Sequence, residues 1–210
     1  MRFIKNYEWL APSVIFTVML VLVRICHAHN HSMSFVPWNM ALAIVPLYLS
    51  FKLDKIKNKA LMYLCALGWL LFFPNAMYMV TDLFHLRERA DAPEWFDLLI
   101  LFSSALNGLV MGLLSLSHVE KWLRKIVKAK YITLVIFTLF ILCGYGIYLG
   151  RYERWNSWDI VTQPLDLIQD IAYNLRHPFR GRETWALSVL FGVWLFLLYK
   201  YFKRFTVRFR

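Results

Sequence analysis

The stretch ALMYLCALGWLLFFPNAMYMVTD, residues 60–82, decides the fold of this chain. It has no charged residue before Asp82, and its length matches the roughly 20 apolar residues that an α-helix needs to cross a hydrocarbon core about 30 Å thick. Five further apolar runs of similar length flank it. The sequence therefore predicts six membrane-spanning helices, near residues 10–26, 38–53, 60–82, 95–117, 131–149 and 185–202.

The composition supports the same fold class. Of the 210 residues, 60% are hydrophobic and 18% are aromatic. Because the six apolar runs take up most of the chain, the short connectors between them leave no room for a sizeable soluble domain. We expect an all-α integral membrane bundle that forms a single domain over residues 1–210. The three cysteines lie in three different apolar runs without a C-x-x-C pair, which favours neither a disulfide framework nor a cysteine-based metal site.

The distribution of charge predicts the orientation in the membrane. Six helices place both termini and the second and fourth connectors on one side, and that side carries 16 of the 24 Lys and Arg residues. The opposite side carries 10 of the 13 acidic residues. Since basic residues mark the cytoplasmic side, we expect cytoplasmic termini in a cell membrane. The net charge of +11 then reflects topology, and we expect no nucleic-acid partner.

The fifth connector, residues 150–184, is too long for a tight turn. Its apolar residues recur at helical spacing, with polar residues mostly on the opposite face. The apolar set is Val161, Leu165, Ile168, Ile171, Ala172 and Leu175. This pattern predicts an amphipathic helix near residues 160–176 that lies along the outer membrane surface.

The most suggestive chemistry lies at the end of the third predicted helix. Asn75, Tyr78, Asp82 and His85 share one helical stripe there. A carboxylate and an imidazole three residues apart can act as a base with its orienting partner, or as two metal ligands. The alternative is a structural pair at a helix end, where polar residues are tolerated.

Other polar residues near the predicted spans have similar alternatives. Asn156 and Asp159, with Arg154 before them, either cap the amphipathic helix or face the third-helix stripe. Asn107 needs a hydrogen-bond partner within the membrane. It either forms a hydrogen bond between helices or binds a substrate. Arg24, if buried, needs a carboxylate, and Asp82 or Asp97 is the expected partner.

A divalent metal cofactor is an open alternative. The run His27-Ala28-His29-Asn30-His31 could supply imidazoles to a divalent metal together with Asp82 and His85, but alternating histidines do not by themselves define a coordination geometry. The chain has no G-x-S-x-G, H-E-x-x-H or G-x-x-x-x-G-K-[ST] motif. Familiar hydrolase, zinc-protease and phosphate-loop signatures are therefore missing.

Three motifs together resemble a known family. They are Pro74-Asn75-x-x-Tyr78-x-x-Thr81-Asp82-x-x-His85, Gly108-Leu109-x-x-Gly112-x-x-Ser115-Leu116 and Arg154-Trp155-Asn156-Ser157-Trp158-Asp159. The combination resembles the bacterial multi-pass membrane proteins called domain of unknown function 1361, from the second helix to the sixth. The resemblance implies a shared membrane fold and family-typical polar positions, here Asn75, Asp82, His85, Asn156 and Asp159. It implies no reaction, and the histidine run lies outside its pattern.

Three function hypotheses follow from these residues. The first is a membrane-embedded hydrolase or transferase, with Asp82 and His85 as catalytic residues acting on a lipid or lipid-linked substrate. Its orienting residues would be Asn75, Tyr78, Asn107, Arg154, Asn156 and Asp159. The second is a non-catalytic membrane partner or assembly protein, with a homodimer or another membrane protein as its partner. The third is a small transporter, which is disfavoured because only Ser115 and Ser117 continue a polar path beyond Asn107 and because six helices show no repeat.

Overall fold

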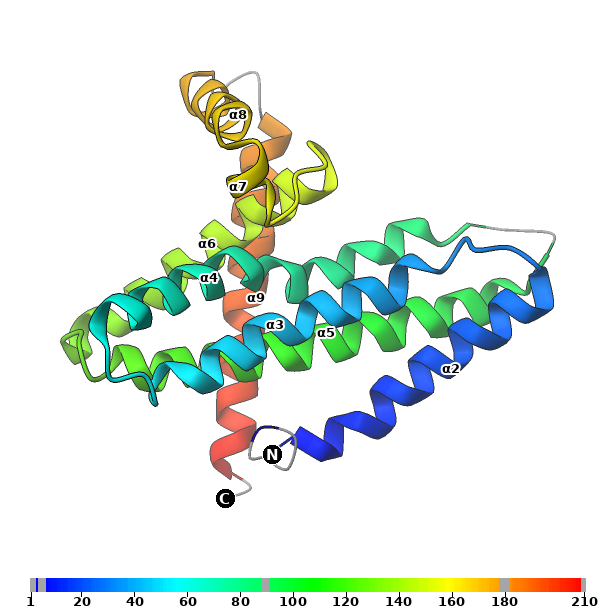
Figure 1. The fold of residues 1–210 in the computed structure, drawn as a ribbon, viewed down its shortest axis with the longest axis horizontal. Helices are drawn as coiled ribbons and strands as arrows, with labels where there is room; N and C mark the ends of the chain where they lie inside the picture. The colour runs from blue at the N-terminus through cyan, green and yellow to red at the C-terminus, as the bar shows by residue number, and fades with distance from the viewer. Residues whose placement is uncertain (1–2, 4–6, 88–90, 178–181, 209–210) are drawn as a thin grey trace. The chain divides into compact units, whose positions relative to one another are not determined.

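The computed structural model describes residues 3, 7–87, 91–177 and 182–208. All regular structure in this part of the chain is helical (Figure 1). In chain order the elements are the 3-10 helix η1 (Glu8–Leu10), α2 (Ala11–Ala28), α3 (Phe35–Leu53), α4 (Lys59–Tyr78), the 3-10 helix η2 (Met79–His85), α5 (Glu94–Leu123), α6 (Ala129–Arg151), α7 (Asp159–Thr162), α8 (Pro164–Arg176) and α9 (Arg182–Arg208).

Six helical segments are long and apolar enough to cross a membrane, and each overlaps one predicted span. They are Glu8–Ala28, Phe35–Leu53, Lys59–His85, Glu94–Leu123, Ala129–Arg151 and Thr184–Phe205. Large apolar side chains on their outer faces are exposed, such as Phe16 and Met19 of α2, which suits a helix in contact with lipid. The predicted all-α membrane bundle is confirmed, with ends shifted by a few residues.

The chain forms two compact units, Met1–Val119 and Glu120–Arg210. We call them unit 1 and unit 2 and describe each by itself. The prediction of a single domain stays a prediction.

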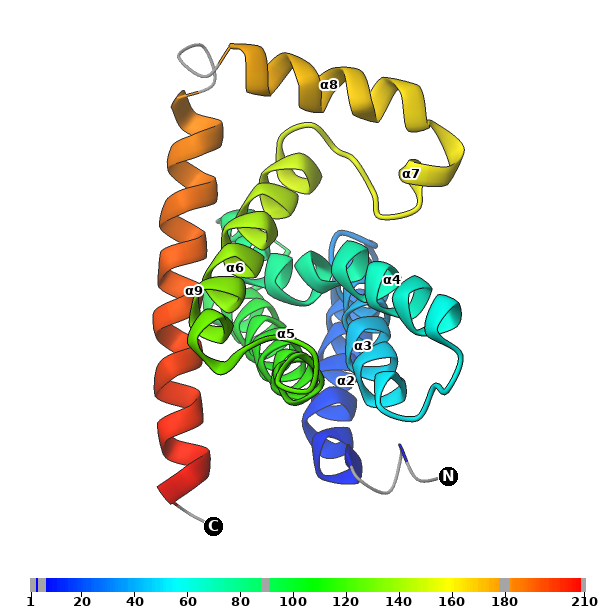
Figure 2. The ribbon, with the colours of Figure 1, turned by 90° about the vertical axis from the view of Figure 1, so that its left-hand side faces the viewer.

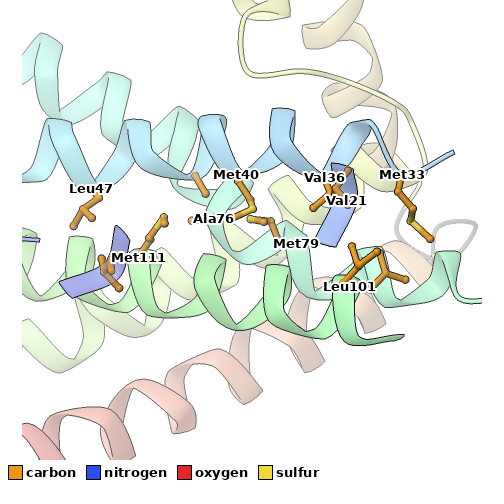
Figure 3. Close-up of a cluster of buried hydrophobic side chains, with 12 residues drawn as sticks. Val21, Met33, Val36, Met40, Leu47, Ala76, Met79, Leu101 and Met111 are labelled. Atoms are coloured by element: carbon orange, nitrogen blue, oxygen red, sulfur yellow. The ribbon is translucent and has the colours of Figure 1, made fainter. Parts of the chain in front are cut away.

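Unit 1 has a core in which methionines fill much of the space between α2, α3, α4 and α5 (Figure 3). Met40, Met79 and Met111 are almost fully buried, and their flexible thioethers fit irregular gaps. Gly108 and Gly112 of α5 lie against α4 and η2. A Cβ on Gly108 would stand 2.5 Å from the Ala76 carbonyl oxygen, so only glycine allows this approach.

Unit 2 is built on the packing of α6 against α9. The ring of Phe140 on α6 lies 5.8 Å from that of Tyr199 on α9, and Ile147 and Leu195 are also fully buried. The two helices come closest at Gly144, where an added Cβ would lie 2.2 Å from the backbone oxygen of Ser188. Figure 2 shows α8 running at a steep angle to α9.

Helix α8 confirms the predicted amphipathic helix of the fifth connector. Asn174 is buried, and Asp170 accepts a hydrogen bond from Trp155 Nε1 at 2.9 Å. The apolar residues Leu165 and Ile168 are exposed instead. Because this helix turns polar groups inward and apolar groups outward, its free face suits a lipid interface better than water.

Candidate functional site

Asp82 is the buried carboxylate around which the candidate site of unit 1 is built. Only 1% of its surface is exposed to solvent, and its Oδ2 accepts a hydrogen bond from Asn39 Nδ2 of α3 at 2.9 Å. A buried carboxylate requires such donors, because water no longer solvates it. The packing of α3 beside α4 and η2 thus gives Asp82 a fixed neutral donor.

His85 lies three residues after Asp82 on the same 3-10 helix. The sequence predicted α-helical spacing here, but residues 79–85 wind with three residues per turn, so side chains at i and i+3 stand one above the other. This winding aligns His85 with Asp82. The imidazole also packs at 5.0 Å from the ring of Phe35 on α3, which restricts its orientation.

Tyr78 and Asn75 lie on the last turn of α4, just before the winding changes. In a 3-10 helix Tyr78 aligns with Thr81 rather than with Asp82, and Thr81 Oγ1 donates a hydrogen bond to the Tyr78 carbonyl at 2.7 Å. Both predicted orienting side chains are half-buried. The stripe predicted from α-helical spacing is therefore interrupted after Tyr78, and an orienting role for Asn75 and Tyr78 stays a prediction.

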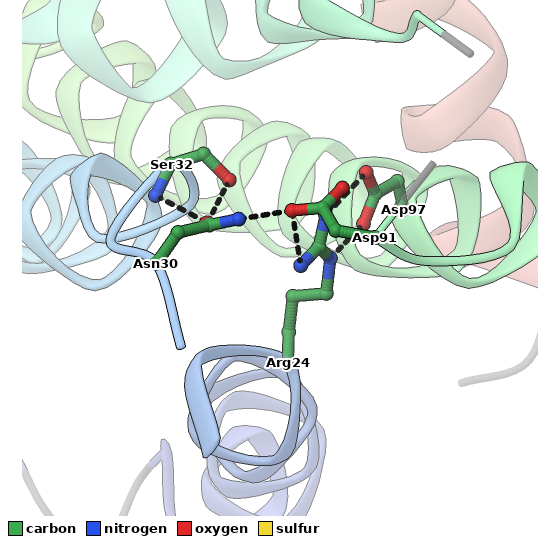
Figure 4. A network of polar contacts seen from close by, with 5 residues as sticks. All are labelled: Arg24, Asn30, Ser32, Asp91 and Asp97. Atoms are coloured by element: carbon green, nitrogen blue, oxygen red, sulfur yellow. Dashed lines mark hydrogen bonds and ion pairs between the residues drawn. The ribbon is translucent and has the colours of Figure 1, made fainter. Parts of the chain in front are cut away.

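Arg24 forms a buried ion pair with Asp97, which confirms one of its two expected partners (Figure 4). The Arg24 Nε lies 2.6 Å from Asp97 Oδ1, and both side chains are almost completely buried. Arg24 Nη2 also donates to Asp91 Oδ1 at 3.2 Å. One cation therefore faces two carboxylates, and each bond compensates part of the desolvation of the guanidinium.

Asp91 links this ion pair to the connector between α2 and α3. Its carboxylate accepts a hydrogen bond from Asn30 Nδ2, and Asn30 Oδ1 accepts from the Ser32 hydroxyl at 2.7 Å. Burial alone would raise the pKa of Asp91, but hydrogen bonding and the charge of Arg24 hold this pKa below its ordinary value. Two connectors are thereby joined at one end of unit 1.

Asn107 serves as an interhelical donor in unit 1. Its Nδ2 donates to Thr17 Oγ1 of α2 at 3.1 Å and lies 3.3 Å from the Ser13 carbonyl. These bonds match the alternative of an interhelical hydrogen bond, because a buried carboxamide must find a partner on a neighbouring helix. A role for Asn107 in orienting a substrate stays a prediction.

In unit 2, Asn156 and Asp159 close a turn at the start of α7. Asp159 Oδ2 accepts the Asn156 backbone N–H at 2.7 Å and its Nδ2 at 3.2 Å, and Oδ1 accepts from Thr162 Oγ1 at 3.1 Å. This arrangement resembles a capping box. Asp159 is the first residue of α7, whose N-cap Trp158 makes no side-chain capping bond, and the N-cap of α8 is Gln163. The predicted capping of the amphipathic helix is therefore wrong, and a joint site with the third-helix stripe stays a prediction. Arg154 is exposed and has a left-handed φ of 61°.

Acidification is expected to weaken this turn through Asp159. The backbone hydrogen bond from Asn156 lowers the pKa of Asp159 below its ordinary 3.8, against the opposing effect of burial. The carboxylate therefore contributes its full stability above pH 3.8, and the contribution is lost as pH falls through the folded-state pKa. We expect Asp159→Ala to lower the free energy of unfolding by about 1 kcal/mol at neutral pH.

This difference between the wild type and Asp159→Ala should shrink as pH falls below 3.8 and through the lower folded-state pKa of Asp159. Thermal unfolding of the two proteins in detergent between about pH 7 and pH 3 measures it. A difference that does not depend on pH would contradict the role assigned to the carboxylate.

His118 belongs to a polar cluster that the sequence analysis did not find. Tyr7 Oη lies 2.8 Å from His118 Nε2, and Ser50 Oγ lies 3.1 Å from His118 Nδ1. Ser50 Oγ also donates to the Leu47 carbonyl at 2.8 Å. Burial raises the pKa of the Tyr7 hydroxyl. These partners are far apart in sequence, so local periodicity gives no signal for them.

The described residues contain no group of three or more His, Cys, Asp or Glu side chains placed to hold a metal ion. Within the histidine run, His27, His29 and His31 are exposed, and His29 ends α2 with a left-handed φ of 51°. The structure thus gives these histidines no shared coordination geometry. What it does bring together in unit 1 is a buried acid, a neutral donor and an aligned imidazole.

The fold defines a multi-pass helical membrane protein. The chain belongs to the family described as protein of unknown function, DUF1361, whose sequence profile matches residues 38–198. This match covers the candidate residues of η2 and the turn at Asn156 and Asp159. Comparison with curated proteins and with solved structures gives no significant match.

Proposed function

We propose that this protein is a membrane-embedded hydrolase or transferase that acts on a lipid or lipid-linked substrate. The observation that carries the proposal is the Asp82 carboxylate, which is buried, receives a neutral donor from Asn39 and stands in line with His85. A carboxylate and an imidazole so arranged can pass a proton between them or to a reacting group. The substrate enters from the outer leaflet, and the termini lie in the cytoplasm, in agreement with the charge asymmetry.

The residues around Asp82 have distinct roles in this proposal. Asp82 is the general base that takes a proton from water or from an acceptor hydroxyl, and His85 is the acid that protonates the leaving group. Asn39 fixes the orientation of the Asp82 carboxylate. Asn75 and Tyr78 orient the substrate from the adjacent turn of α4. Partners other than membrane lipids are not required.

Asp82→Asn tests the general base while it preserves side-chain shape. We expect its activity to fall by about 10²–10⁴-fold with little change in abundance, because an amide oxygen can still accept the Asn39 hydrogen bond. The measurement compares wild-type and variant protein in vesicles of the host's own lipids, with the products identified by mass spectrometry. His85→Ala is expected to lose activity in the same assay.

Asp97→Asn is the matched control, because Asp97 is an equally buried carboxylate with a structural partner, Arg24. We expect this variant to lose abundance first. If Asp82→Asn lost abundance as Asp97→Asn does, and the remaining protein kept full specific activity, Asp82 would be a packing residue. If instead the wild type itself formed no product in this assay, the protein would be better explained as a non-catalytic membrane partner.

A further inference from the structure

Four aromatic rings of unit 2 form a continuous stack where α6 ends and α9 begins. Tyr145 and Tyr148 stack at 6.4 Å between ring centroids, and Tyr148 and Tyr152 stack at 5.3 Å. Trp185 of α9 stacks on Tyr145 at 5.8 Å with an angle of 11° between the planes. We call these four residues the aromatic stack.

Two hydrogen-bond donors in the aromatic stack are buried without a partner in the described chain. They are Tyr145 Oη and Trp185 Nε1. The Asn174 carboxamide acts on the Tyr145 hydroxyl, but the two do not form a hydrogen bond of good geometry. A buried donor without an acceptor is unfavourable in a folded protein, so both groups call for an acceptor that the described residues do not supply.

Neighbouring donors are satisfied, which sets these two apart. Tyr148 Oη donates to Glu153 at 2.9 Å, and Trp155 Nε1 donates to Asp170 at 2.9 Å. Tyr and Trp in a membrane interface usually direct their polar atoms into water or headgroups. Membrane anchoring alone therefore explains the satisfied and exposed aromatic residues but not two covered, unpaired donors.

The position of the aromatic stack indicates a lipid as the source of the acceptor. Tyr145 and Tyr148 lie in the last turns of the span Ala129–Arg151, and Trp185 is the second residue of the span Thr184–Phe205. The ends of spans meet the headgroup layer. The two donors therefore lie at the depth where lipid headgroups supply acceptors.

The surrounding charges decide which headgroup chemistry fits. Two carboxylates lie beside the aromatic stack, because Glu153 accepts a hydrogen bond from Tyr148 and Asp170 accepts one from Trp155, so an anionic phosphate would face like charges there. A cationic headgroup would suit the carboxylates but would leave both donors unpaired. A neutral headgroup rich in hydroxyls can accept from Tyr145 and Trp185, donate to the carboxylates and pack its C–H face on the rings.

We propose that the aromatic stack binds the neutral, hydroxyl-bearing headgroup of a lipid, such as the sugar of a glycolipid. The inference concerns residues of unit 2 only and does not depend on the catalytic roles proposed for Asp82 and His85. Variants of the two sites therefore test the two proposals separately.

The decisive variant is Tyr145→Phe/Trp185→Phe, which keeps the aromatic rings and removes both unpaired donors. Native mass spectrometry counts lipids retained by the full-length protein after release from nanodiscs. The nanodiscs contain equal amounts of monoglucosyl diacylglycerol, phosphatidylglycerol and phosphatidylcholine. We expect the wild type to retain the glucolipid preferentially, and the double variant to bind it about tenfold more weakly or worse.

The thermal stability of the double variant supplies a second readout. Because the two donors have no partner, we expect their removal to leave stability unchanged or slightly higher, whereas Tyr148→Phe and Trp155→Phe should each lower it. Equal retention of the three lipids, a preference for either phospholipid, or unchanged glucolipid binding by the double variant would overturn the proposal. So would a clear loss of stability in the double variant, since its donors would then be bonded within the protein.

Discussion

Arg24→Met is expected to lower the free energy of unfolding of unit 1 by about 3–5 kcal/mol. The substitution keeps an unbranched side chain of similar length but removes the guanidinium that bonds Asp97 at 2.6 Å. Asp97 is 1% exposed, so its carboxylate would remain buried without its cation. Low abundance in the membrane and a large fall in thermal stability are the expected results.

Two further variants separate the broken ion pair from a general effect of mutation. Asp91→Asn should cost much less, because the Asp91 side chain is 33% exposed and Asp97 still balances Arg24. Arg24→Met/Asp97→Leu should recover most of the loss, since an apolar pair can replace a buried ion pair at little cost. A stable Arg24→Met protein, or a double variant worse than the single one, would contradict this account.

Gly144→Ala is expected to destabilise unit 2 by about 3 kcal/mol or more. Its Cβ would lie 2.2 Å from the Ser188 oxygen and 3.0 Å from the Ser188 carbonyl carbon. Backbone atoms cannot rotate away as a side chain can, so α6 and α9 would have to move apart. That movement would loosen the packing between Phe140 or Ile147 and the facing residues of α9.

Gly68→Ala is the matched control within the same chain. At this position the nearest atom to an added Cβ is Leu49 Cδ1 at 3.5 Å, an ordinary van der Waals contact. We expect this variant to be as stable as the wild type or slightly more stable, because alanine has a higher helix propensity than glycine. Thermal unfolding and purified yield compare the two variants, and equal values for both would refute the proposed close approach at Gly144.

Much of the fold could be predicted because each span is specified locally. A helix in lipid satisfies its own backbone hydrogen bonds, so apolar length alone locates it within a few residues. Local periodicity likewise predicted the apolar and polar faces of α8. Asp97 could also be predicted as a partner for Arg24, since a buried guanidinium must meet a carboxylate near the same end of its helix.

The candidate site could be predicted only in part, because it depends on which helices lie side by side. Asp82 and His85 stood out as a pair, but hydropathy says nothing of the lateral neighbour that brings Asn39 to Asp82. The cluster of Tyr7, Ser50 and His118 was missed for the same reason. The 3-10 winding of residues 79–85 was missed too, because Pro74 and the residues after it do not dictate three residues per turn.

The tighter winding of η2 also bears on the depth at which Asp82 and His85 stand. The 20 α-helical residues of α4 rise about 30 Å, which already equals the hydrocarbon thickness of a bilayer. The seven residues of η2 then rise about 14 Å at roughly 2.0 Å each, instead of about 10.5 Å in an α-helix. A helix that enters the hydrocarbon core at Lys59 would therefore carry the carboxylate and the imidazole past the acyl chains, to the level of the ester and phosphate bonds.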